Sequence, residues 1–90
     1  MEPILSNPLL FIISATPQDE AETKALVESL VKNPRWVIPG YTTVKPTGLV
    51  HEGVMTVRVE TQEDAAMIRM AIPAERIVQV RFPSNGERFA

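Results

Sequence analysis

One histidine and one pair of adjacent carboxylates have the most obvious capacity for chemistry in this chain. His51 could serve as a general base or a metal ligand, but nucleophilic catalysis also needs a partnered serine, and zinc needs further nitrogen or sulfur ligands. Glu52 is its neighbour, and neighbouring side chains of an extended segment point to opposite sides. We therefore expect His51 to be a solvated loop residue.

The adjacent carboxylates are those of Glu63 and Asp64, in a segment with a helical pattern. Adjacent helical positions diverge by about 100° around the axis, so the two groups do not converge on one substrate atom. Both fall in the expected first turn, where negative charge stabilises a helix through its dipole. Their position favours helix stabilisation over acid–base catalysis.

Other catalytic and cofactor-binding patterns are missing from the sequence. The chain has no cysteine, which excludes a disulfide framework, a thiolate metal site and a cysteine nucleophile. Its four glycines are scattered and form no glycine-rich phosphate-binding motif. We expect no enzymatic activity, no cofactor and no metal.

The composition is that of one ordinary globular domain. The 90 residues carry a formal charge of −2, with 44% hydrophobic and 22% charged residues, which excludes a disordered or strongly cationic chain. Apolar runs are far shorter than the ~20 residues of a membrane span, and the first seven residues lack the positive start of a secretory signal. We expect a single cytoplasmic domain over 1–90, with an ordered core over about 8–83 and a polar tail over 84–90.

Hydrophobic patterns predict two helices and four strands. The first helix follows the N-cap residue Thr16 and stops at Asn33-Pro34, and the second opens at Gln62 behind Thr61 and closes at Pro73. Strands are expected over 9–14, 35–45, 54–60 and 76–82. Pro39 interrupts the second strand, which predicts an edge strand, a bulged strand or two short pieces, because proline cannot donate to a sheet ladder.

The order of these elements is β-α-β-β-α-β. Two helices with one apolar stripe each need a surface to bury it, and four short strands offer one such surface. We predict an α+β fold of the ferredoxin-like plait type, with a four-stranded antiparallel sheet in the order 4-1-3-2 and both helices on one face.

Two segments carry a likeness to a known family. Residues 53–65, with the sequence GVMTVRVETQEDA, combine a glycine, an alternating strand, an acidic residue and a helix start, and Leu10-Phe11-Ile12 places an aromatic in the first strand. These features resemble the RNA-recognition motif family, which has the same plait topology and stacks RNA bases on aromatic side chains of its central strands. At the third-strand stacking positions this chain has Val54 and Thr56, so Phe11 is the one stacking candidate left. Glu52 stands where the family has a basic residue, and the net charge is negative, which disfavours nucleic acid.

Strand alternation predicts an apolar patch, rimmed by two arginines, on the sheet face away from the helices. The residues expected there are Leu9, Phe11, Ile13, Val54, Thr56, Arg58, Ile77, Gln79 and Arg81. Six of the eleven acidic residues lie on the predicted helices, so this face is comparatively positive. Because exposed apolar patches on small proteins usually mark interaction sites, we predict that this face binds a partner.

The second predicted helix offers an alternative surface. Its stripe of Ala65, Ile68 and Ile72 faces the sheet, yet Met67 and Met70 extend the apolar surface around the helix. A helix that is apolar nearly all round is expected to be covered on two sides, and methionine adapts to irregular partners. The cover is either a partner on Met67 and Met70 or the chain's own segment 46–53 or tail.

These observations favour a small non-enzymatic protein–protein interaction module, such as an adaptor, regulator or inhibitor. It would bind a protein, or a second copy of itself, through the open sheet face or an edge strand over 36–43. The alternative is a single-stranded RNA- or DNA-binding domain that uses Phe11, Arg58 and Arg81. A third hypothesis, a dimeric domain that senses a small ligand, rests on fold analogy. We expect neither a membrane nor a metal as a partner.

Overall fold

The computed structural model describes residues 4–38, 53–83 and 88–89. These residues form a domain that contains both strands and helices. Its elements, in chain order, are β1 (Ile4–Ser14), α1 (Glu20–Leu30), β2 (Arg35–Ile38), β3 (Val54–Thr61), α2 (Gln62–Ala71), the short 3-10 helix η1 (Ala74–Arg76), β4 (Ile77–Arg81) and β5 (Arg88–Phe89).

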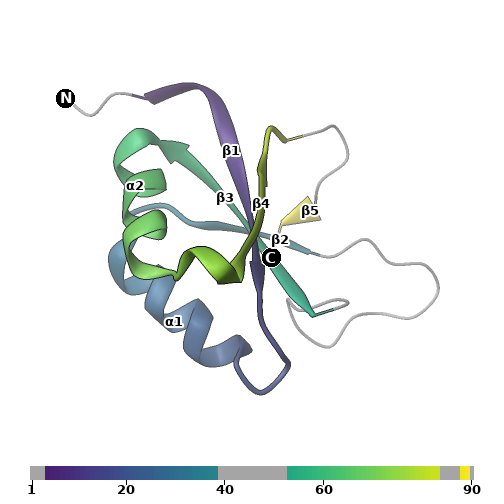
Figure 1. The fold of residues 1–90 in the computed structure, drawn as a ribbon. Helices are drawn as coiled ribbons and strands as arrows, with labels where there is room; N and C mark the ends of the chain where they lie inside the picture. Colours follow the sequence, from purple (N-terminus) through teal and green to yellow (C-terminus); the bar gives the residue numbers. More distant parts are fainter. Residues whose placement is uncertain (1–3, 39–52, 84–87, 90) are drawn as a thin grey trace.

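The strands form one antiparallel sheet in the order β4-β1-β3-β2-β5. Both helices lie on the same side of it (Figure 1). The predicted α+β class, with an antiparallel sheet and two helices, is confirmed. The sheet nevertheless has five strands where four were predicted, because Arg88–Phe89 pairs with β2. A two-residue strand is too short to leave an alternating pattern in the sequence.

The core lies between the helices and one face of the sheet. It contains Val27 and Val31 from α1 and the turn after it, Ala65 and Ile68 from α2, and the β3 residues that alternate toward the helices, Met55, Val57 and Val59. All three β3 residues are fully buried. The predicted alternation of β3 is therefore confirmed, because one strand face has branched or long apolar side chains and the other has Thr56 and Arg58.

The first helix starts later than predicted. The amide N–H of Asp19 donates to the carbonyl oxygen of Thr16 at 2.9 Å, and the Thr16 hydroxyl donates to the Asp19 carboxylate at 2.9 Å. Thr16 therefore closes a turn before the helix, and α1 begins at Glu20 behind Asp19. Thr23 and Val27 are buried on this helix, whereas Leu26 is 40% exposed.

The second helix starts as predicted. The Thr61 hydroxyl oxygen accepts a hydrogen bond from the Asp64 amide at 3.1 Å, which is N-capping in its usual form. The buried Asp64 carboxylate in turn accepts from the Lys32 amide at 3.1 Å through Oδ1. This bond joins the chain just after α1 to the start of α2.

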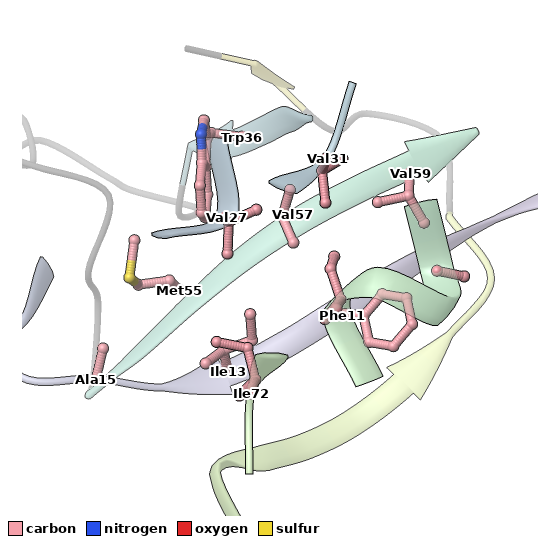
Figure 2. Close-up of a cluster of buried hydrophobic side chains, with 12 residues drawn as sticks. Phe11, Ile13, Ala15, Val27, Val31, Trp36, Met55, Val57, Val59 and Ile72 are labelled. Carbon is pink, nitrogen blue, oxygen red and sulfur yellow. The ribbon is translucent and has the colours of Figure 1, made fainter. Parts of the chain in front are cut away.

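The single tryptophan secures β2 to the helical layer. Trp36 is 4% exposed, and its indole N–H donates to the Glu28 carboxylate at 3.0 Å. In Figure 2 it stands beside Val27 and Val57. The predicted edge strand over 35–45 is therefore wrong for residues 35–38, since β2 has β3 on one side and β5 on the other. Pro39 and the rest of that segment lie outside the described residues.

Candidate functional site

The first strand has the opposite orientation to the one predicted. Phe11 and Ile13 are both fully buried and belong to the core cluster under the helices. Figure 2 shows Phe11 beside α2 and Ile13 close to Ile72. Their predicted place on the outer sheet face is wrong. The reason is that residues 9–13 are apolar on both faces of the strand, so the sequence alternation does not show which face points to the helices. The orientation is set by the pairing of Phe11 with Val57 and of Ile13 with Met55.

Leu9 and Ile77 also belong to the helix side. Both are partly buried and pack against the core cluster. Leu9 follows the same reversed phase as Phe11. In β4 the register shifts, because Ile77 pairs with Ile13 whereas Gln79 pairs with Ile12. Val78 is thus an extra residue at a β-bulge, which turns Ile77 to the core face and interrupts the simple alternation.

Five of the predicted surface residues do lie on the face opposite the helices. They are Val54, Thr56, Arg58, Gln79 and Arg81, placed there by the register of β3 and β4 against β1. On β1 itself this face holds Leu10 and Ile12, which pair with Arg58 and Thr56. Leu10 is fully buried and Ile12 is half-buried, so among the described residues this face has no large exposed apolar patch.

An arginine row crosses this outer face. Arg81 pairs with Leu10, Leu10 pairs with Arg58, and Arg58 pairs with Arg35, so three arginines from β4, β3 and β2 lie in one line. The Nε of Arg58 also donates to the Glu60 carboxylate at 2.8 Å on the same face. Sequence reasoning did not include Arg35. Its alternation with the apolar Trp36 is a signal that could have placed it on the outer face.

The β4 edge is the second surface feature. β4 ends the sheet order and is paired with β1, and no described strand lies on its other side. Val78 is 59% exposed, and Phe82, directly after the strand, is 63% exposed. The exposure of Val78 and Phe82 gives this edge two large apolar side chains.

The two methionines predicted as an alternative site have different environments. Met70 is 81% exposed on α2, whereas Met67 is partly buried and packs against the core cluster. Met67 is therefore not a free surface residue in the described structure. Phe11 is covered from this helix by Arg69, whose guanidinium carbon lies 5.3 Å from the ring centroid.

A shallow hollow of about 380 Å³ lies at the start of α1, lined by Asp19, Glu22, Thr23, Leu26 and Arg76. Arg76 is the residue that shapes it. Its guanidinium donates to the Ser14 carbonyl oxygen at 2.8 Å and to the Thr23 hydroxyl at 3.0 Å. These bonds tie η1 to β1 and α1, which gives Arg76 a structural role.

Among the described residues, no three His, Cys, Asp or Glu side chains gather as metal ligands would. His51 and Glu52 lie outside the described residues. Asp64 is buried with a carboxylate oxygen, Oδ2, that has no hydrogen-bond partner, and Glu63 pairs with Lys32 at 3.8 Å. None of the described helices is both long enough and apolar enough to span a membrane.

Comparison with known proteins does not show which family the chain belongs to. The chain matches no family model, no curated protein and no solved structure. The likeness to the RNA-recognition motif family therefore stays a prediction from residues 53–65 and the first strand.

Proposed function

We propose that the domain is a ferredoxin-like plait extended by β5 beyond β2. The supporting observations are two helices on one face of an antiparallel sheet and the neighbour order β4-β1-β3-β2 within the five strands. In this arrangement β5 forms one edge of the sheet with two residues, and β4 forms the other, with no described strand on its far side.

We further propose that the chain is a non-enzymatic protein–protein interaction module that adds a strand to β4, and that the strand comes from a second copy of the chain. The observation that carries this proposal is the edge position of β4 with Val78 and Phe82 exposed beside it. An unpaired edge presents backbone donors and acceptors to another strand, and exposed apolar residues add binding energy.

The residues of β4 permit a symmetric pairing of two copies. The bulge at Val78 re-aims this side chain within the strand. In an antiparallel pair related by a two-fold axis at Gln79, each Val78 faces Val80 of the other copy and each Arg81 faces Ile77. No like charges lie opposite one another in this register. Like charges directly opposite one another would destabilise an antiparallel pair.

Nucleic-acid binding is the less supported alternative. It depends on stacking of bases on aromatic side chains, and its one predicted stacking residue on the sheet, Phe11, is buried in the core. The edge proposal depends on residues that are exposed.

Analytical ultracentrifugation over a concentration series tests the edge proposal. We expect a dimer with a dissociation constant of about 1–100 µM, because a five-residue edge makes an interface at the small end of the range. Replacing both apolar residues, Val78→Lys with Phe82→Lys, should give a monomer, since two lysines would be brought against the partner strand.

Met70→Lys is the control, because it adds a lysine charge to a more exposed apolar residue that lies on α2 and away from the β4 edge. This variant should dimerise like the unmodified chain. A chain that stays monomeric at roughly 1 mM, where an association of about −4 kcal/mol would already be visible, contradicts the proposal. Loss of the dimer in Met70→Lys alone would move the interface to α2.

A further inference from the structure

The hollow at the start of α1 is lined by charges of both signs. Its volume of about 380 Å³ lies within the range of small-molecule sites, which is roughly 300–1,000 Å³. Asp19 and Glu22 bring two carboxylates to it, and Arg76 brings one guanidinium. In the described structure no ion pair joins Arg76 to either carboxylate. One positive and two negative charges therefore line the same hollow without neutralising one another directly.

The guanidinium of Arg76 is held in place by neutral oxygen atoms. Its Nε and Nη2 both donate to the Ser14 carbonyl oxygen, at 3.1 and 2.8 Å, and Nη2 also donates to the Thr23 hydroxyl at 3.0 Å. Thr23 is 3% exposed, so the group that orients the guanidinium is itself buried. None of the described hydrogen bonds uses Nη1, which leaves two N–H donors and the positive charge for an anionic group.

The opposite wall attracts cations and carries an apolar surface. Asp19 and Glu22 are three positions apart at the start of α1, which places them on one side of the helix. The Asp19 carboxylate accepts from the Thr16 hydroxyl through Oδ2, and the Glu22 carboxylate has no described hydrogen-bond or ion-pair partner. Leu26 lies one turn further along and is 40% exposed, so it offers a surface for an aliphatic chain.

We propose that this hollow binds a free α-amino acid with a basic side chain, such as lysine. Its carboxylate accepts from Nη1 of Arg76, its two ammonium groups pair with the carboxylates of Asp19 and Glu22, and its methylene chain lies against Leu26. The two positive and one negative charges of such an amino acid complement those of the lining. The inference goes beyond the proposed pairing of β4, since none of the lining residues belongs to that strand.

Titration of the full chain, labelled with nitrogen-15 and observed through its amide chemical shifts at low salt, tests this proposal with three probes. L-lysine carries every group, cadaverine is lysine without its carboxylate, and L-leucine lacks the second ammonium group. We expect lysine to shift the amides of residues 19–26 and 76 in a saturable way. The dissociation constant should be about 1 mM, because the hollow is open and each exposed ion pair contributes up to about fivefold.

Cadaverine and leucine should bind about two- to fivefold more weakly than lysine, because each lacks one ion pair. The cadaverine comparison tests Arg76 without replacing it. A substitution of Arg76 would also remove its bonds to Ser14 and Thr23, and so would disturb the fold.

Glu22→Gln tests the carboxylate wall, because Glu22 is exposed and its replacement breaks no described contact. This variant should weaken lysine binding about two- to fivefold. Glu75→Gln is the matched control, since it makes the same change to an exposed glutamate of η1 that does not line the hollow. It should change the affinity by less than about 1.5-fold, because solvent and salt screen an exposed charge outside the site. Circular dichroism melting verifies that both variants are folded.

Three outcomes would overturn the proposal. One is the absence of saturable shifts at the lining residues up to roughly 20 mM lysine, far above the expected dissociation constant. Another is equal affinity for lysine and either of the other probes, which would remove the role of Arg76 or of the second carboxylate. The third is equal weakening by Glu22→Gln and Glu75→Gln, which would mean that net charge alone attracts lysine.

Discussion

Phe11 and Phe82 have opposite environments. Phe11 lies in β1, and Phe82 directly follows β4, the neighbour of β1 in the sheet. Phe11 is fully buried under α2, and Phe82 is 63% exposed after β4. Phe11→Ala should lower the free energy of unfolding by about 3–5 kcal/mol, because it removes a large core side chain and leaves a cavity. Phe82→Ala should change it by less than about 0.5 kcal/mol.

Urea denaturation followed by circular dichroism measures both values. If Phe11→Ala cost less than about 1 kcal/mol, the burial of Phe11 and the reversed phase of β1 would be wrong. The comparison also separates folding from binding, since Phe82 belongs to the proposed interface and Phe11 does not.

The phase of a strand can be predicted from its residues where the two faces differ. In β3 the polar Thr56 and Arg58 alternate with Met55 and Val57, so the inward face is identifiable. In β1 the residues over 9–13 are apolar on both faces, so either phase satisfies the pattern. The outward positions of Thr56 and Arg58 on β3 were therefore predicted correctly, and those of Phe11 and Ile13 on β1 wrongly.

At the scale of elements, helices and paired strands of ordinary length are predictable, whereas local irregularities are not. The N-cap residue Thr61 predicted where α2 starts, and the apolar stripe of α2 predicted which face is buried. The bulge at Val78 depends on pairing with β1, and β5 depends on the contact of two residues with β2. Such features arise from tertiary contacts, which local sequence patterns do not predict.

The joint between α1 and α2 depends on one buried carboxylate. Asp64 caps no helix itself, but its Oδ1 accepts the Lys32 amide at 3.1 Å, and the side chain is 2% exposed. Asp64→Ala should lower the free energy of unfolding by about 1 kcal/mol, because the Lys32 N–H loses its acceptor in a partly buried hydrogen bond.

The neighbouring Glu63→Ala is the control for this joint. It removes a carboxylate from the same helical turn, so it shares the loss of the favourable dipole interaction, which is about 0.3–1 kcal/mol. Its ion pair with Lys32 spans 3.8 Å between exposed side chains and contributes little. Thermal and urea denaturation should show Asp64→Ala as the more damaging change, and equal effects would contradict a role for the Lys32 bond.

At the scale of the whole molecule, one core connects every layer. Strands β1, β2 and β3 and both helices contribute to a single buried cluster, and Trp36 lies within it. Its indole N–H bond to Glu28 joins β2 to α1, so its environment is lost only when the sheet and the helices separate. A domain of this size with one core is expected to unfold in a single cooperative step.

Tryptophan fluorescence and far-ultraviolet circular dichroism should therefore give the same urea midpoint, with a slope of about 1 kcal/mol per molar. The single tryptophan makes the fluorescence signal unambiguous. If the fluorescence transition came clearly before the loss of helix signal, β2 would detach from α1 as a separate unit. In that case Arg35 would move independently of Arg58, its register partner on β3.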